Sequence, residues 1–318
     1  MFEEAVICGK FIPFHKGHEL LFDTAKALGV RKLYVVIGVE NSTIPVDVRK
    51  KWIREYTTLP IEFIPDKVFS SQEETDVNGT IISQVWWNNW TNYVKEFVNT
   101  GEKVCVISSD LYGKEIARRL DCQWVPVDPE RFNYPIRGSV IMQDLRANWN
   151  MLSDKAKPYF TKRIAFLGPE SSGKTTLVQT LQKLPNVSCV HEWGRTVDVY
   201  KGDLTKEDFS RIFAMQNMFI NKFSDTPYLI SDTEAITTFI FYKIFFGDNE
   251  EVEKLKDYYV QQNDIYCYIL LKPSIPFVDD GTRVTQYLDR DLIFEELLAE
   301  VKKTGKKYIV TTVEDILK

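Results

Sequence analysis

Two segments of this 318-residue chain carry residue types that suit phosphate chemistry. The clearer one is Gly168–Thr175, which reads Gly-Pro-Glu-Ser-Ser-Gly-Lys-Thr and matches the pattern G-x-x-x-x-G-K-[ST] at every fixed position. Its glycines allow the backbone to wrap a polyphosphate, Lys174 supplies a positive charge to the β- and γ-oxygens, and Thr175 offers a hydroxyl to Mg²⁺. The pattern is that of an ATP-binding loop, so we expect ATP as co-substrate and Mg²⁺ as cofactor.

Lys174 is the catalytic candidate of this loop, and its neighbours are expected to bind the nucleotide through backbone and hydroxyl groups. The expected nucleotide-binding residues are Gly168, Ser171, Ser172, Gly173, Thr175 and Thr176. An apolar run at 229–231 ends in Asp232, which is expected to hold Mg²⁺ together with Thr175 or to accept a proton from a substrate hydroxyl. We therefore predict a phosphotransferase site in the second half of the chain.

A second acid competes with Asp232 for the role of base. Glu192 follows a strand-like run in His191-Glu192-Trp193-Gly194-Arg195, and Arg195 is expected to hold phosphate or a ribose hydroxyl. The alternative for this pair is an ordinary surface ion pair. Further along, residues 277–283 and Arg290 have the composition of a lid. Its Asp280, Arg283 and Arg290 are expected to approach the transferring phosphoryl group, although a plain loop is the alternative.

The other segment lies near the start of the chain and carries two histidines. His15-Lys16-Gly17-His18 follows Gly9-Lys10-Phe11 and an apolar run at 5–8. Two imidazoles three residues apart at a helix start are placed to donate to α- and β-phosphate oxygens, and Gly17 allows phosphate to approach between them. We expect His15 and His18 to be catalytic and Gly9, Lys10, Phe11 and Gly17 to contact the nucleotide. This chemistry suits adenylyl transfer to a phosphate, because the nucleophile is already anionic and needs no general base.

Both segments stand in a repeated alternation of short apolar runs and helix-period segments. Strands are predicted at 4–9, 32–39, 61–65, 103–108, 163–168, 188–191, 228–231, 265–271 and 307–310. Helices are predicted at 17–28, 48–56, 83–99, 111–120, 174–182, 205–223 and 291–303. This alternation is typical of an α/β protein with parallel sheets covered on both faces, in which ligands bind at the carboxyl ends of the strands. The pattern breaks at 147–162, which predicts two doubly wound domains, 1–155 and 156–318.

Composition narrows the class of protein. The net charge of −5 provides no basic surface for nucleic acid, so we expect no nucleic-acid partner. The five cysteines have no C-x-x-C spacing, which indicates free thiols in a reducing compartment and no zinc site. The acidic N-terminus leads directly into a strand, and the most apolar stretch, 238–246, is too short to span a bilayer. We expect a cytoplasmic protein with small-molecule substrates and a homo-oligomeric assembly.

Taken together, these motifs resemble the NadR family of bifunctional nicotinamide mononucleotide (NMN) adenylyltransferases and ribosylnicotinamide kinases. The resemblance covers nearly the whole chain and is carried by residues 9–18, 49–55, 135–141, 148–149, 158–160, 168–176, 192–195, 232–238 and 280–283. It implies a Rossmann-like nucleotidyltransferase domain that makes NAD from NMN and ATP. It also implies a P-loop kinase domain that phosphorylates nicotinamide riboside to NMN.

Three departures from the family pattern bear on function. The helix-turn-helix segment that precedes the first domain in some members is not found ahead of the first strand here, so we expect no repressor function. Met142 stands where the adenylyltransferase pattern has an arginine on its phosphate-binding helix, and Arg137 and Arg146 are the candidate substitutes. Phe277 stands where a tryptophan is expected to stack on the nicotinamide ring, and a phenylalanine is also able to stack.

Three hypotheses follow. The first is the bifunctional enzyme of NAD salvage. The second, motivated by Met142, is a riboside kinase whose first domain binds pyridine nucleotide and regulates the second. The third, which only the family resemblance implies, is functional coupling to a membrane riboside transporter, with phosphorylation trapping the imported riboside. Measuring NMN and NAD formed from riboside separates the first two hypotheses.

Overall fold

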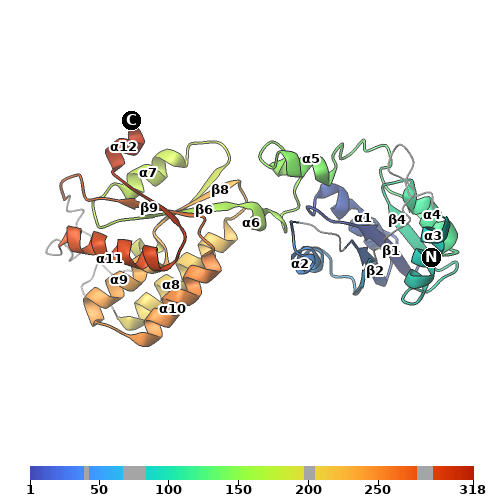
Figure 1. Cartoon of the computed structure of the whole chain (residues 1–318), viewed down its shortest axis with the longest axis horizontal. Helices are drawn as coiled ribbons and strands as arrows, with labels where there is room; N and C mark the ends of the chain where they lie inside the picture. The colour runs from blue at the N-terminus through green and yellow to red at the C-terminus, as the bar shows by residue number, and fades with distance from the viewer. Residues whose placement is uncertain (39–42, 67–83, 197–204, 278–288) are drawn as a thin grey trace. The chain divides into compact units, whose positions relative to one another are not determined.

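The computed structural model (Figure 1) describes residues 1–38, 43–66, 84–196, 205–277 and 289–318. The chain divides into two compact units, Met1–Ala156 and Lys157–Lys318. Each unit is built around one five-stranded sheet in which all neighbouring strands are parallel. The prediction of an α/β protein with parallel sheets is thus confirmed.

The sheet of the first unit has the strand order β3-β2-β1-β4-β5. Its strands are β1 (Glu4–Gly9), β2 (Lys32–Ile37), β3 (Ile61–Pro65), β4 (Val104–Ser108) and β5 (Gln123–Pro126). The chain passes from β1 outward to β3 and then returns past β1 to β4, so the order reverses next to β1. In doubly wound sheets ligands bind at the carboxyl ends of the strands at such a reversal, where the segment 9–18 lies.

Helices cover both faces of this sheet. They are α1 (Lys16–Ala27), α2 (Val46–Tyr56), α3 (Gln84–Lys95), α4 (Tyr112–Arg119), α5 (Gly138–Gln143) and the 3₁₀ turn η1 (Trp149–Met151). Val6 packs with the α3 tryptophans Trp86, Trp87 and Trp90 and with Ile116 of α4. On the other side, Phe22 of α1 meets Tyr56 of α2 edge to face. The tryptophan-rich segment is therefore core.

The sheet of the second unit has the order β10-β9-β6-β8-β7. Its strands are β6 (Lys162–Leu167), β7 (Val187–Val190), β8 (Tyr228–Asp232), β9 (Cys267–Leu271) and β10 (Lys307–Thr311). The central strand β6 leads into the phosphate loop and pairs with β8 on one side and β9 on the other. The two acids expected at the site, Glu192 and Asp232, thus follow β7 and end β8 at the same edge of the sheet.

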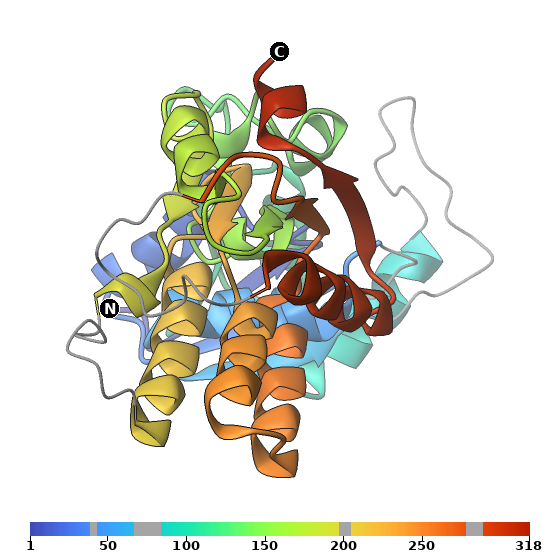
Figure 2. The same cartoon turned by 90° about the vertical axis from the view of Figure 1, so that its left-hand side faces the viewer.

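The helices of the second unit are α6 (Lys157–Phe160), α7 (Lys174–Leu181), η2 (Trp193–Arg195), α8 (Lys206–Lys222), α9 (Ala235–Phe246), α10 (Glu250–Asn263), α11 (Arg290–Lys303) and α12 (Val313–Leu317). Helices α8, α9 and α10 pack side by side, with α11 against α9 (Figure 2). Alternate residues of β6 face opposite layers. Ala165 and Leu167 pack with α9 and α11, whereas Phe166 packs with α7 and with Val313 of α12.

Among the elements that the sequence did not predict are helices α9 and α10, strand β5 and the short helices α5, α6 and α12. Helix α9 includes the apolar stretch 238–246 and is buried on several sides, so its sequence shows no amphipathic period. Helix α10 begins at Asn249, whose side chain accepts from the N–H groups of Glu251 and Val252. Strand β5 is short and half-exposed and has no apolar run to mark it. Over the ranges that the structure describes, no helix is both long and apolar enough to cross a membrane.

Candidate functional site

The phosphate loop of the second unit is held by close backbone packing. Gly173 precedes α7 with a positive φ of 90°, a conformation that favours glycine. A Cβ at Gly173 would lie 2.7 Å from the Val313 side chain, and one at Gly168 would lie 2.7 Å from the Leu271 carbonyl oxygen. The two glycines of the motif are therefore required by packing as well as by the turn. The C-terminal helix α12 and strand β9 fix the path of the loop.

Lys174 lies inside this loop. Its Nζ donates to the carbonyl oxygens of Gly168 at 2.8 Å and Pro169 at 2.9 Å, and the side chain is buried. The ammonium group thus lies inside the turn that precedes α7, next to the free N–H groups at the start of that helix. A cation and a helix N-terminus that share one concave backbone favour a polyphosphate anion there.

Thr175 and Asp232 meet beside the loop. Thr175 Oγ1 donates to Asp232 Oδ2 at 2.8 Å, while Asp232 Oδ1, although buried, has no hydrogen-bond partner among the described residues. Burial raises the pKa of the Asp232 carboxyl; Lys174 opposes this rise and Glu192 adds to it. A half-buried hydroxyl beside a buried carboxylate is a suitable donor set for Mg²⁺, which protein sites bind through one or two carboxylates and substrate phosphates.

Protein side chains alone do not form a metal centre here. Among the described residues, no group of three or more His, Cys, Asp or Glu side chains is arranged to hold a metal ion. The pair Thr175–Asp232 therefore fits a cation that takes its other ligands from nucleotide phosphates and water, as Mg²⁺ does in nucleotide sites.

Glu192 lies near Asp232 and is paired with Arg195. The Arg195 Nε donates to Glu192 Oε2 at 3.0 Å across the turn η2, and the Glu192 side chain is mostly buried whereas that of Arg195 is 40% exposed. This is the ion pair that the sequence left as an alternative. It brings a cation and a carboxylate to the carboxyl edge of the sheet, beside the phosphate loop.

Gln216 of α8 connects the two acid-bearing segments and was not anticipated. Its Oε1 accepts from the Trp193 N–H at 2.8 Å, and its Nε2 donates to Ser231 Oγ at 3.0 Å and to the Asp232 carbonyl at 3.4 Å. Gln216 is buried. No local signal distinguishes it, because a single glutamine within an amphipathic helix has no motif of its own.

Arg290 differs from the expectation of a lid arginine. It begins α11, and its Nε, Nη1 and Nη2 donate to the carbonyl oxygens of Glu170, Ile275 and Ser171 at 3.0, 2.9 and 2.9 Å. Its donors are therefore directed to the outer side of the phosphate loop. Asp280 and Arg283 lie outside the described residues, and Phe277 is the last residue described before that gap.

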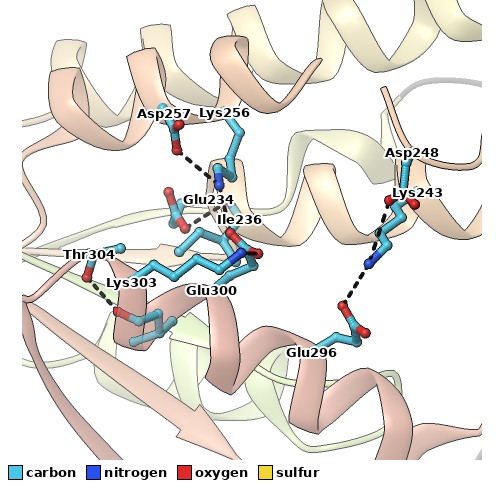
Figure 3. A network of polar contacts seen from close by, with 11 residues as sticks. Glu234, Ile236, Lys243, Asp248, Lys256, Asp257, Glu296, Glu300, Lys303 and Thr304 are labelled. Carbon is cyan, nitrogen blue, oxygen red and sulfur yellow. Dashed lines mark hydrogen bonds and ion pairs between the residues drawn. The ribbon is translucent and has the colours of Figure 1, made fainter. Parts of the chain in front are cut away.

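A polar network supports the turn that follows Asp232 (Figure 3). Glu234 caps α9 by accepting from the Ile236 N–H at 2.9 Å, and its other carboxylate oxygen is buried without a partner among the described residues. Burial raises the pKa of this carboxyl to about 7. Nearby, Lys256 of α10 pairs with Glu300 of α11 at 2.6 Å, with both side chains buried. These contacts tie α9, α10 and α11 together behind the site.

In the first unit, a buried arginine holds the loop after β1 through hydrogen bonds to backbone carbonyls. Arg49 of α2 donates through Nη1 to the carbonyl oxygens of Lys10 at 2.6 Å and Gly38 at 2.7 Å. Phe11 is buried with φ of 54°, and its ring lies 3.1 Å from where a Cβ on Gly9 would be. Gly9 is thus needed to accommodate the ring, and the exposed Lys10 stands at the top of the loop.

His15 and His18 lie together at the start of α1. Their ring centroids are 3.8 Å apart, and His15 Nδ1 accepts from the Gly17 N–H at 3.1 Å. Burial lowers the pKa of His15 to about 4 and that of His18 well below its usual 6.5, and in both cases the charge of Arg131 contributes. Because Nδ1 of neutral His15 accepts, its proton is on Nε2, which is the atom able to donate to a ligand.

Arg131 belongs to none of the motifs in the sequence and was not anticipated. Its Nη1 donates to the Ile136 carbonyl at 2.9 Å and its Nη2 to Asp110 Oδ1 at 2.8 Å. Asp110 follows β4, which neighbours β1, so the guanidinium lies at the same sheet edge as the histidines. The signal was weak because Arg131 lies in a loop more than a hundred residues after the histidines.

The helix that carries Met142 starts against the same loop. A Cβ on Gly138, the first residue of α5, would lie 2.3 Å from the Ile12 carbonyl oxygen. Met142 is half-buried, while Arg137 and Arg146 are exposed. Of the arginines in the described part of the chain, Arg131 is the one whose charge acts on both imidazoles.

The sequence of this chain is similar to those of known proteins. A family model described as an AAA domain matches residues 163–316. The trifunctional NAD biosynthesis/regulator protein NadR of Escherichia coli (strain K12) is 28% identical over 337 residues, which covers 98% of this chain and 78% of the relative. Its counterpart from Salmonella typhimurium (strain LT2) is 29% identical over 326 residues, covering 94% and 76%.

Solved structures show the same fold over almost the whole chain. A NadR protein in complex with NR has a TM-score of 0.70 at 20% identity and covers 98% of this chain and 90% of its own. A NadR protein in complex with NAD and AMP-PNP has a TM-score of 0.68 at 19% identity, covering 98% and 91%. At this identity the structural likeness concerns the fold.

Proposed function

Because the chain belongs to the NadR family, we propose that it is a bifunctional enzyme of NAD salvage. The second unit phosphorylates nicotinamide riboside with ATP to give NMN. The first unit transfers the adenylyl group of ATP to NMN, giving NAD and pyrophosphate. The observation that supports the kinase most strongly is the hydrogen bond from Thr175 to the buried Asp232 beside a complete phosphate loop.

In the kinase site, residues of this chain bind the ATP phosphates, orient the reacting groups and accept a proton from the riboside. The loop backbone and Lys174 bind the β- and γ-phosphates, and Lys174 neutralises charge that develops on the γ-phosphoryl oxygens. Thr175 and Asp232 are the residues that would hold Mg²⁺, which when bound neutralises phosphate charge. This leaves Glu192 to accept the proton of the riboside hydroxyl, with Arg195 holding the Glu192 carboxylate in place.

In the transferase site, the phosphate of NMN attacks the α-phosphorus of ATP, the bond to the β-phosphate oxygen breaks, and pyrophosphate leaves. The nucleophile is already an anion, so the site must mainly position the groups and stabilise charge. His15 donates through Nε2, while His18, Lys10 and Gly17 surround the same position. We propose that Arg131 adds a fixed positive charge beside the histidines, without making the phosphate contact that an arginine at position 142 would make.

The second hypothesis, a riboside kinase with a pyridine-nucleotide-binding first domain, is favoured by Met142 and by the exposed positions of Arg137 and Arg146. One experiment separates the two. The pure protein is incubated with nicotinamide riboside, ATP and Mg²⁺, and NMN and NAD are followed together. We expect NMN to appear first and NAD to follow. Accumulation of NMN without NAD at high enzyme concentration would leave only the kinase. Self-association and coupling to a riboside transporter remain predictions.

A further inference from the structure

Gln216 makes contacts with both backbone segments that carry an acid of the proposed kinase site. Its side-chain carbonyl oxygen accepts from the N–H of Trp193, and Trp193 is the residue directly after Glu192. Its amide nitrogen donates to Ser231 Oγ and to the carbonyl of Asp232. One buried side chain from α8 thus spans the gap between the turn after β7 and the end of β8.

The contacts continue into the turn that follows Asp232. Ser231 Oγ donates to the Thr233 carbonyl at 2.6 Å, and the Thr233 N–H donates to the Phe166 carbonyl at 3.1 Å. Thr233 has φ of 74°, so this turn has a backbone conformation that a threonine seldom adopts. The Gln216 amide therefore supports the turn at the point where β8 ends.

An amide is the side chain that satisfies this position. It must accept on the Trp193 side and donate on the Ser231 side, and the uncharged amide of glutamine does both from the two atoms of one planar group. A carboxylate of the same length would keep the acceptor but present an anion to the carbonyl oxygen of Asp232, beside two acids. An apolar side chain would leave a buried N–H and a buried carbonyl unpaired.

We propose that Gln216 is a positioning residue of the kinase site, which fixes the spacing between the Glu192 and Asp232 segments through one amide. The inference depends on the proposed kinase activity for its functional consequence, but its structural part is testable without any substrate. Gln216 does not touch the reacting atoms. Its expected effect is on turnover, because a displacement of about 1 Å in a reacting site is enough to cost about 10²-fold in rate.

Two substitutions of Gln216 separate its contact with Trp193 from its contacts with the end of β8. Gln216→Met removes both, whereas Gln216→Glu keeps the acceptor for the Trp193 N–H and removes the donor to the β8 end. Asn221→Asp, an exposed amide-to-acid change on the same helix, is the control. By hydrogen exchange, the Trp193 amide should exchange about tenfold faster in Gln216→Met, the factor expected for one lost hydrogen bond. It should remain protected in Gln216→Glu and in Asn221→Asp.

In kinetics, both Gln216 variants should lower kcat for NMN formation by roughly 10- to 100-fold with KM values for riboside and ATP within about twofold. Asn221→Asp should match wild type. Wild-type kcat in both Gln216 variants, or an unchanged Trp193 exchange rate in Gln216→Met, would overturn the proposal. An effect confined to KM would do the same, because it would place Gln216 in substrate binding.

If wild type makes no NMN, the proposed kinase activity fails, and a second measurement still decides the role of Gln216. Calorimetry with AMP-PNP, with and without Mg²⁺, reports whether Asp232 and Thr175 are correctly placed. We expect the gain in affinity caused by Mg²⁺ to shrink about tenfold in Gln216→Glu, as for one lost polar contact. An equal gain in wild type and in this variant would refute the positioning role.

Discussion

Thr175 and Asp232 are 57 positions apart in the sequence, yet the hydroxyl of one donates to the carboxylate of the other at 2.8 Å. Thr175 is the second residue of α7 and Asp232 the last of β8. The parallel pairing of β6 with β8 aligns Phe166 with Asp232, so the strand that leads into the phosphate loop and the strand that ends in the acid finish at the same edge. The hydrogen bond between Thr175 and Asp232 is thus a consequence of sheet register.

Lys174→Ala should lower NMN formation from riboside by about 10²-fold or more, because a lost charge contact to the transferring phosphate costs several kcal/mol. The measurement is the initial rate of NMN formation. Synthesis of NAD from supplied NMN should change little, since the proposed transferase site consists of residues of the first unit. An unaffected kinase rate would show that the second-unit assignment is wrong.

Asp232→Asn should cost more in turnover than Glu192→Gln. Loss of a carboxylate beside Thr175 weakens the charge stabilisation on which phosphoryl transfer mainly depends, whereas a loose transition state needs less from a base. The two variants should also differ in their requirement for Mg²⁺, which is expected to rise only for Asp232→Asn. If Glu192→Gln shows the larger loss of turnover, Glu192 and not Asp232 is the acid on which the reaction depends more.

Arg290→Lys tests whether this arginine supports the loop or reaches the phosphate. Lysine retains the charge but cannot donate to three carbonyls in the geometry of Arg290. We expect the KM for ATP to rise several-fold with kcat within about threefold, the signature of weakened uniform binding. A fall in kcat of about 10³-fold would instead assign Arg290 the role of an arginine finger.

NAD synthesis from NMN and ATP should respond to changes at His18, Met142 and Arg131. His18→Ala should abolish most of it, because the ring lies 3.8 Å from His15 at the helix start. Met142→Arg should raise it by roughly one to two decades, the rate equivalent of one charge-assisted phosphate contact. Arg131→Ala should lower it further than Arg137→Ala or Arg146→Ala. Kinase activity, measured in the same preparations, is the control.

A contrary result with Met142→Arg would also be informative. No effect, or a slower reaction, would mean that another arginine already occupies the expected role. If Arg131→Ala makes NAD at the wild-type rate, Arg131 does not have that role. Arg137 and Arg146 would then be the remaining candidates.

Glu234 should make stability depend on pH. Its pKa is raised from 4.5 to about 7 by burial, so between these values the folded protein binds more protons than the unfolded chain. The free energy of unfolding should therefore fall as pH rises from about 4.5 to 7, by about 3 kcal/mol from this residue. Urea unfolding of Glu234→Gln against wild type should show the variant gaining relative stability over this range. The exposed Glu295→Gln is the control, and a pH-independent difference for Glu234→Gln would contradict the prediction.

Local pattern was sufficient for every strand except β5 and for the loops that follow two of them. Runs 4–9 and 61–65 coincide with β1 and β3, in which Ala5, Val6, Ile7 and Ile64 are fully buried, as is typical of apolar positions in parallel strands. The half-exposed β5 and the uniformly apolar α9 lacked the period that identifies an element. Met142 was recognised because it departs from a pattern, whereas Gln216 belongs to none.

The sequence by itself determined which groups lie together when their partners are near in the chain. These are the glycines, Lys174 and Thr175 of one loop and the histidines of the other. Their roles follow from a strand, a turn and a helix start that adjoin in sequence. Only the tertiary structure decided that Arg290 holds the carbonyls of Glu170 and Ser171 and that Gln216 connects Trp193 to Ser231. Hydrogen bonds between distant segments depend on strand order and helix packing, and these are set by burial of the whole sheet, which no short stretch of residues encodes.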